Sequence, residues 1–292
     1  MTLLKAIIMG IIQGLAEFLP ISSSGHLAIF KHILNINTDT GLLFDVLLHF
    51  GTLVALFIAF WKDIKELIIE GFSIIGVYFG NIGHWFWNIF HTEKTTYNKV
   101  ITTPYRRFVM LIIVSTIPTG IIGILLKDVI EFSSTTLLIP GLFLILTGIL
   151  LTIADKVRTG KKDEKDATYK DAGVIGIAQG IATMPGLSRS GTTITACLLC
   201  GFDKTFAVKY SFIMSIPAIL GAIVLELKDF SISSVGETEM LYYLIGTIIS
   251  SVIGYICIKT MLVIVRGKKF KYFAYYCFII GFIAVIGNFI VA

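Results

Sequence analysis

The stretch GIIQGLAEFLPISSSG, residues 10–25, decides the fold because it occurs twice. Shifted by 166 residues, it lies over GIAQGIATMPGLSRSG, residues 176–191, without a gap, and 8 of the 16 positions are identical. In each copy an apolar run is broken by Pro, Gly and several hydroxyl side chains. A repeat of this kind indicates a chain built from two related halves.

The composition places both copies in a membrane protein. Only 15% of the 292 residues are charged and 55% are hydrophobic, whereas soluble domains carry about 25% charged residues. The low cysteine count and the lack of biased tracts exclude a disulfide scaffold, a collagen and a disordered chain. A net charge of +5 reports orientation in a membrane, so nucleic-acid binding is not expected. The pair Cys197 and Cys200 lacks a second pair at zinc-site spacing, so we expect no metal there.

Six stretches are long and apolar enough to cross a bilayer as helices, which takes about 20 residues. We predict spans at residues 41–61, 108–126, 132–154, 205–225, 240–258 and 272–292. Lys and Arg gather in alternate connections, which predicts that these connections face the cytoplasm. The basic connections are residues 62–107, 155–170 and 266–271. Residues 1–40 and the C-terminus are then expected on the outer side.

Residues 71–92 form a further uncharged stretch of sufficient length. If this stretch crossed the membrane, the basic residues of 94–107 would face outward or every later span would reverse. We therefore predict an aromatic helix that lies in the membrane interface. His84 and His91 are then polar residues at the level of the lipid headgroups.

Residues 1–34 and 171–202 contain the two copies and are too polar at their centres for ordinary spans. Glu17 and the absence of a cleavage pattern indicate that the first is retained structure and not a signal peptide. Backbone that leaves a helix at membrane depth must be buried in protein or line a wet cavity. We therefore predict two re-entrant helical hairpins that meet at one site. Because three spans follow each hairpin, the second enters from the opposite face.

The expected fold is an all-α polytopic membrane protein that forms a single domain. It has six transmembrane helices and two re-entrant hairpins arranged as an inverted-topology repeat. Repeat one covers about 1–154 and repeat two about 171–292.

The breaks are suited to binding an anion. We expect the second helix of each hairpin to restart just after the S-x-S-G motif, so that its free N–H groups point at the break. Two such ends brought together would hold two linked phosphates. The copies differ in reactive residues: Glu17, Ser23 and His26 of the first align with Thr183, Arg189 and Thr192 of the second.

Charged side chains at membrane depth cost about 2.5–3.5 kcal/mol on insertion scales and therefore serve a function or pair with one another. An ion pair between Glu17 and Arg189 that only holds helices together is the structural alternative. Gln13 precedes Glu17 by four residues, so both lie on one helix face and can point into the cavity, where Gln13 is a candidate substrate-binding residue. Asp45 and His49, also four apart, are predicted to line the cavity wall. The hydroxyl residues of the breaks are candidate phosphate ligands: Ser22, Ser24, Ser188, Ser190, Thr192 and Thr193.

The sequences QGLAEFLPISSSGH (residues 13–26) and PGLSRSGTT (185–193) carry a resemblance to a known family. They resemble the two signature motifs of the bacterial undecaprenyl-pyrophosphate phosphatase family, the bacitracin-resistance type, and the resemblance covers essentially the whole chain. It implies a phosphatase of the bacterial plasma membrane that removes the terminal phosphate of undecaprenyl diphosphate. This reaction regenerates the lipid carrier for peptidoglycan synthesis.

The resemblance implies Glu17, Ser23, His26 and Arg189 as catalytic residues. Ser23 is the expected nucleophile, and Glu17 takes its proton directly or through His26. His26 protonates the leaving phosphate or stabilises the adduct, and Arg189 neutralises phosphate charge. Attack by a metal-bound water, with Ser23 only binding phosphate, is the alternative. A divalent cation, Mg²⁺ or Ca²⁺, is also implied, with Glu17 as its expected ligand.

A transporter or flippase of a polyprenyl phosphate lipid would use the same anion site, and broken helices in inverted repeats are typical of transporters. The gathering of Glu17, Ser23 and His26 on one repeat favours chemistry instead. The expected partners are a polyprenyl diphosphate lipid and the bilayer, and a homodimer stays open. Because the first hairpin enters from the outer side, we expect the active cavity to face outward.

Overall fold

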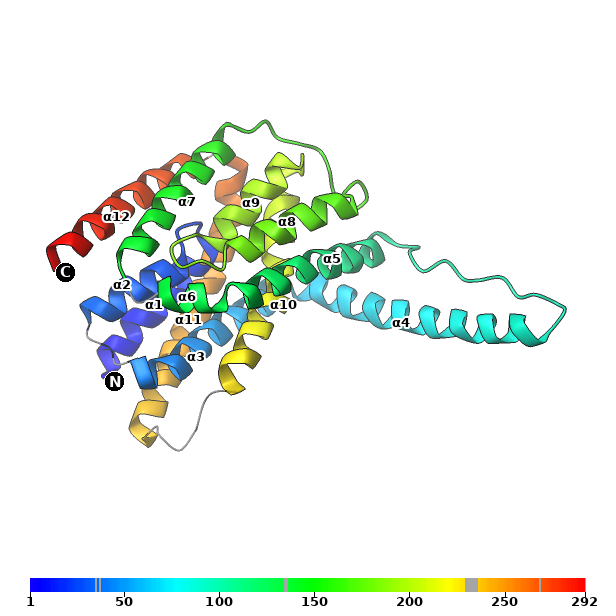
Figure 1. Cartoon of the computed structure of the whole chain (residues 1–292), viewed down its shortest axis with the longest axis horizontal. Helices are drawn as coiled ribbons and strands as arrows, with labels where there is room; N and C mark the ends of the chain where they lie inside the picture. Colours follow the sequence, from blue (N-terminus) through cyan, green and yellow to red (C-terminus); the bar gives the residue numbers. More distant parts are fainter. Residues whose placement is uncertain (35, 37, 134–135, 229–235, 268, 292) are drawn as a thin grey trace.

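The computed structural model describes residues 1–34, 36, 38–133, 136–228, 236–267 and 269–291. Every named element in these ranges is helical, and Figure 1 shows a helical bundle from which one helix projects. The predicted all-α architecture is therefore confirmed. Lys268 and parts of two predicted spans, residues 134–135 and 292, lie outside the described residues.

Two helix–break–helix units form where the sequence repeats. The first consists of α1 (Leu3–Phe18) and α2 (Ser23–Ile33), and the second of α8 (Tyr169–Ile181) and α9 (Arg189–Leu199). In both units the second helix starts inside the S-x-S-G motif, so the prediction of a start after it was wrong. The reason is helix capping: the Oγ atoms of Ser22 and Ser188 accept the N–H groups of Gly25 and Gly191, as N-cap residues do.

The remaining helices are α3 (Thr38–Ala59), α4 (Trp61–Phe90), α5 (Pro104–Leu125), α6 (Lys127–Ser133), α7 (Leu138–Lys156), α10 (Lys204–Lys228), α11 (Glu237–Ile264) with the 3₁₀ turn η2 (Val265–Gly267), and α12 (Phe270–Val291). Within the described part of the chain, six helices are long and apolar enough to cross a membrane: α4, α5, α7, α10, α11 and α12. Five of these match predicted spans. The other predicted span is α3, whose described apolar stretch is Leu43–Ala59.

Helix α4 differs from the interfacial helix predicted at 71–92. The helix begins at Trp61, ten residues before the predicted start, and runs for 30 residues. Only Phe60 separates it from α3. The charged residues after Trp61 resemble a loop in sequence, but Lys and Glu are good helix formers. Ile64 and Leu67 are buried and attach this first part of the helix to the bundle.

Helices from the two halves pack together reciprocally. Helix α1 lies along α11, α8 lies along α5, and α7 lies along α12. Gly10 of α1 allows close approach, because a Cβ there would lie 2.5 Å from the carbonyl oxygen of Gly246. Gly176, the same position in the second copy, would meet the carbonyl oxygen of Ser115 at 2.2 Å. The inversion of the halves across a membrane stays a prediction that this pairing supports.

The apolar core fills the space around the two breaks. Its largest side chains come from several helices of both halves and include Phe18, Phe108, Tyr210 and Phe212. Phe18 and Phe212 meet edge to face with ring centroids 5.4 Å apart. The helices that carry the polar motifs are thus fixed by burial of large apolar groups.

Candidate active site

The two breaks touch each other in the interior of the bundle. A Cβ on Gly25 would lie 2.9 Å from the Cα of Gly186, and Ser190 Oγ donates to the carbonyl of Leu19 at 3.4 Å. Thr147 of α7 fixes the second break, since its Oγ1 donates to Gly186 O at 3.1 Å and accepts the N–H of Ser188 at 2.9 Å. The two repeated motifs therefore build one site.

The first break contains strained backbone. Ser22 has a φ of 72°, the one positive value among the described residues other than glycine. Such conformations are costly for a side chain that carries a Cβ and cluster at functional sites. Here the turn places the hydroxyl of Ser23 against the end of α1.

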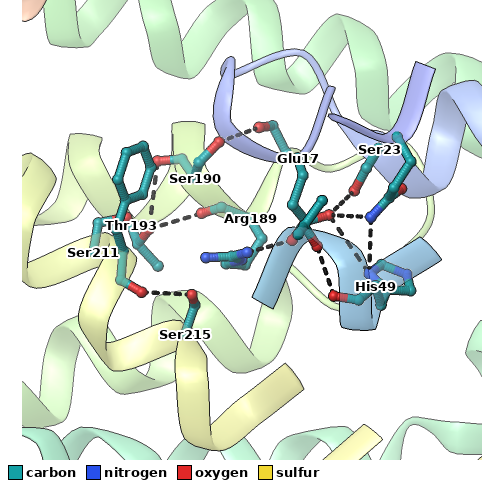
Figure 2. Close-up of polar contacts among 12 residues, drawn as sticks. Glu17, Ser23, His49, Arg189, Ser190, Thr193, Ser211 and Ser215 are labelled. Carbon is teal, nitrogen blue, oxygen red and sulfur yellow. Dashed lines mark hydrogen bonds and ion pairs between the residues drawn. The ribbon is translucent and has the colours of Figure 1, made fainter. Parts of the chain in front are cut away.

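Glu17 is the centre of the site. Its Oε2 accepts hydrogen bonds from Ser23 Oγ at 2.7 Å and from Gln13 Nε2 at 3.0 Å, and its Oε1 pairs with Arg189 Nη2. Figure 2 shows the carboxylate between Ser23 and His49 on one side and Arg189 on the other. Glu17 is only 6% exposed, and a buried carboxylate needs such charge and hydrogen-bond compensation.

Several polar atoms at this site have no partner in the described part of the chain. They are Arg189 Nη1, Gln13 Oε1 and Thr192 Oγ1, and all are buried. An unmade hydrogen bond at a buried group costs about 1–3 kcal/mol. A purely structural Glu17–Arg189 pair explains neither the free guanidinium nitrogen nor the serine hydroxyl on the same carboxylate. A ligand with acceptor oxygens would satisfy Arg189.

His49 of α3 belongs to the carboxylate cluster. Its Nδ1 lies 3.0 Å from Gln13 Nε2 and 3.7 Å from Glu17 Oε2. Asp45, predicted beside it on the cavity wall, instead pairs with Lys31 of α2. The signal for His49 in the sequence is an imidazole in a mainly apolar helix. Its spacing from Asp45 does not reveal Glu17 as its neighbour.

His26 lies elsewhere than its place in the motif suggests. Its Nδ1 donates to Ser22 O at 2.8 Å, and its Nε2 bonds to the hydroxyl of Tyr276 at 2.8 Å. The ring stacks on Tyr276 with centroids 5.6 Å apart. Both ring nitrogens are therefore occupied, and neither bonds to Glu17 or Ser23. Tyr276 of α12 carries no sequence signal that separates it from the other aromatic residues of that helix.

The other candidate hydroxyls divide into two groups. Ser22 and Ser188 cap helices, and Thr193 Oγ1 bonds to Arg189 O at 2.8 Å and to Ser211 Oγ at 2.6 Å, as Figure 2 shows. Ser190 bridges the two breaks through its bond to Leu19. Ser24 is exposed, and Thr192 Oγ1 is unpartnered. These last two are the most available for a ligand.

The site does not by itself form a metal centre. Among the described residues no group of three His, Cys, Asp or Glu side chains is placed to hold a metal ion. Glu17, the predicted ligand, already accepts three hydrogen bonds, and Gln13 Oε1 is the free oxygen beside it. All four cysteines are free thiols, and three of them are buried.

The profile of the family described as bacitracin resistance protein BacA matches residues 6–283. The chain belongs to this family. Curated relatives named undecaprenyl-diphosphatase include a protein of Methanosphaera stadtmanae, 44% identical over 97% of both chains, and one of Halothermothrix orenii, 42% identical over 98% of both. A protein of Bacillus thuringiensis named undecaprenyl-diphosphatase 4 is 37% identical over 98% of this chain and 97% of its own.

Proposed function

We propose that this membrane protein hydrolyses undecaprenyl diphosphate to undecaprenyl phosphate and inorganic phosphate. The names of its relatives support this activity. The observation that carries the proposal is the 2.7 Å bond from Ser23 Oγ to Glu17 Oε2, beside an Arg189 nitrogen that has no partner. A hydroxyl on a base and a free cation next to it are the parts that phosphoryl transfer requires.

In the proposed reaction Ser23 Oγ attacks the terminal phosphorus. Its proton moves to Glu17 Oε2 as the new oxygen–phosphorus bond forms and the bond to the bridging oxygen breaks. Undecaprenyl phosphate leaves with that oxygen. Water then attacks the phosphoserine and the bond from Ser23 Oγ to phosphorus breaks. Glu17 returns its proton to Ser23 Oγ, and inorganic phosphate is released with both hydrogens of the water.

Arg189 has two tasks in this scheme. Its Nη2 holds Glu17 in place, and its Nη1 binds an oxygen of the transferred phosphoryl group. The first N–H groups of α2 and α9 lack intrahelical partners and add positive potential at the two breaks. Charge on the diphosphate is thereby neutralised where it develops.

The two histidines support the site in different ways. We propose that His49 orients Gln13 and Glu17, since it lies within hydrogen-bonding distance of the Gln13 amide. The sequence predicts His26 as a proton shuttle or a stabiliser of the adduct, and its ring instead bonds to the strained turn at Ser22 and to Tyr276. We propose that His26 positions Ser23 by holding this turn.

A divalent cation, Mg²⁺ or Ca²⁺, remains part of the proposal as a companion of the diphosphate. Both ions are hard cations that bind phosphate oxygens and carboxylates. The residues present do not form a site for one alone, because the Glu17 oxygens are taken by Ser23, Gln13 and Arg189. No step above therefore depends on the ion.

Attack by water, with Ser23 only binding phosphate, stays the alternative mechanism. Transport of a polyprenyl phosphate finds no support in the relatives, which are named as diphosphatases. We further propose the plasma membrane as the location, an active cavity that opens to the outer side, and basic connections in the cytoplasm. The distribution of Lys and Arg supports this orientation. We also propose a homodimer, which measurement of the oligomeric state in detergent solution would test.

Reconstitution tests the proposed activity. Proteoliposomes supplied with undecaprenyl diphosphate should release inorganic phosphate, and a Glu17→Ala variant should release almost none. Lipid sidedness is measured in the same vesicles. Movement of the lipid between leaflets without phosphate release would contradict the proposed hydrolysis.

A further inference from the structure

Residues 61–103 form an arm that consists of α4 and the chain that returns along it (Figure 1). The arm leaves the bundle, and only Ile64 and Leu67 of α4 are buried. The rest of this helix exposes an unusual amount of aromatic surface. The outer part of α4 projects from the bundle together with its own returning chain, as Figure 1 shows.

One face of α4 is a stripe of large apolar side chains. They recur every three, four or seven residues, which is the spacing of one helix face. All are exposed: Trp61, Ile68, Phe72, Ile75, Phe79, Phe86 and Phe90. We call these residues the apolar stripe.

The opposite face of α4 binds the return segment, residues 91–103. Asn81 pairs with both backbone groups of Asn98, donating to its carbonyl at 2.9 Å and accepting its N–H at 2.8 Å. Asn88 pairs in the same way with Thr95 at 2.9 and 2.7 Å. The return segment is thus fixed along the outer half of the helix.

The two ends of the arm meet at its base. Arg106 Nε donates to Glu70 at 2.7 Å, and the Tyr105 hydroxyl donates to Asp63 at 3.0 Å. The chain therefore leaves and rejoins the bundle at one place. Helix α5 starts from the same level at which α4 starts.

This geometry argues against a membrane crossing by α4, although the helix is long and apolar enough for one. If α4 crossed, the non-helical return segment would cross with it and would carry exposed Glu93, Lys94 and Lys99 into the hydrocarbon. Non-helical backbone exposed to lipid is not tolerated there. An arm in open water is also unfavourable, because the apolar stripe would remain exposed.

We propose that the arm lies flat on the bilayer surface, at the level where it leaves and rejoins the bundle. The apolar stripe then lies in the lipid and the return segment lies in water. Exposed Lys62 and Lys65 at the base of the arm match anionic headgroups. Trp85 and Trp87 are suited to the headgroup level. The crossings between the two broken units are then α3, α5 and α7. This number is odd, as the inverted repeat requires.

The tryptophans make the proposal testable, because the chain has three and all lie in α4, at positions 61, 85 and 87. In a background of Trp61→Phe, Trp85→Phe and Trp87→Phe, single reporters are placed on the apolar stripe as Phe72→Trp, Phe79→Trp or Phe86→Trp. Each variant is reconstituted in phosphatidylcholine–phosphatidylglycerol vesicles that carry lipids brominated at a shallow or a deep carbon. Val77→Trp, on the face that holds the return segment, is the matched control.

All three stripe reporters should be quenched, each more strongly by the shallow bromine, and the control should be quenched much less. A crossing helix would instead place the central reporter, Phe79→Trp, near the deep bromine while the outer two stay shallow, and this result would overturn the proposal. Equal lack of quenching at all four positions would also overturn it, since the arm would then lie in water or against a second copy.

A second measurement does not depend on tryptophan. Glu93→Cys at the tip of the arm and Lys161→Cys in the connection before α8 are treated with a membrane-impermeant thiol reagent in sealed vesicles, after the native cysteines are removed. The proposal expects both positions to react from the same side. Reaction from opposite sides means that α4 crosses.

Discussion

At the scale of single residues, Glu17 contacts both the Ser23 hydroxyl and the Arg189 guanidinium. One of its oxygens accepts the Ser23 hydroxyl and the other binds Arg189. The carboxylate therefore holds the proposed nucleophile, Ser23, and the proposed phosphate-binding cation, Arg189, in a fixed relation. Loss of either contact should impair turnover without unfolding the bundle.

Replacing Arg189 by Lys should remove most activity although the charge is kept. The guanidinium holds Glu17 with Nη2 and leaves Nη1 for phosphate, and a single ammonium does not reach both. Removing one preorganised donor of this kind lowers turnover about a hundredfold or more. Phosphate release by the purified variant measures the effect. Full activity in Arg189→Lys would reduce the residue to a structural ion-pair partner.

His49→Ala should lower turnover about tenfold, because Gln13, which orients Glu17, loses a hydrogen-bonding neighbour worth about 1–2 kcal/mol. Asp45→Asn on the same helix is the control, since Asp45 pairs with Lys31 outside the cluster. Kinetics of both variants at saturating lipid separate the two. Equal turnover in the His49 variant and the control would contradict the proposed role of His49 in orienting Gln13 and Glu17.

The sequence predicts that the two motifs bring Glu17, Ser23 and Arg189 together, but it does not predict all of their neighbours. Glu17, Ser23 and Arg189 come together because they flank two breaks that the repeat already relates. His26 follows the serines in sequence, yet its ring bonds to Tyr276, 250 residues away. His49 joins the carboxylate from a separate helix. Such contacts depend on tertiary packing, which local motifs do not encode.

At the scale of elements, close helix packing depends on particular glycines. Gly176→Ala should destabilise the protein by about 1–3 kcal/mol, because the new methyl group would overlap the backbone of α5. Gly173 lies three residues earlier in α8, and a Cβ at this position would have no neighbouring atom within 4 Å. Gly173→Ala should therefore be neutral or stabilise by up to about 1 kcal/mol. Thermal unfolding in one detergent compares them, and equal melting temperatures would contradict the packing scheme.

Element boundaries are predictable from the sequence where hydrophobic length governs them and less so where local chemistry does. The breaks occur where Pro, Gly and Ser cluster, but Ser22 and Ser188 start the following helices earlier than expected by capping them. Helix α4 is longer than predicted because helix-forming Lys and Glu residues continue it back to Trp61. The short helix α6 has no counterpart among the predicted elements, since its seven residues carry no clear periodicity.

For the whole molecule, the distribution of basic residues predicts its orientation. In intact cells, an impermeant thiol reagent should spare Lys161→Cys and modify Lys127→Cys, because the first lies in a basic connection and the second in the alternate one. Lys127 is well exposed at the start of α6. The reverse labelling pattern would mean that the cavity opens to the cytoplasm and that the proposed orientation is wrong.

Ser23 is the group that attacks phosphorus in the proposed mechanism, and the other proposed roles depend on this step. The decisive measurement gives the reconstituted protein undecaprenyl diphosphate with a radiolabelled terminal phosphate, stops the reaction within a single turnover, and maps the label on the chain. We predict label on Ser23. Ser23→Ala should keep lipid binding and lose turnover by orders of magnitude, while Ser22→Ala and Ser24→Ala lose about 1–3 kcal/mol at most. Equal, modest defects at all three serines with no labelled protein, and the largest loss in Glu17→Gln, would contradict the account and establish attack by water.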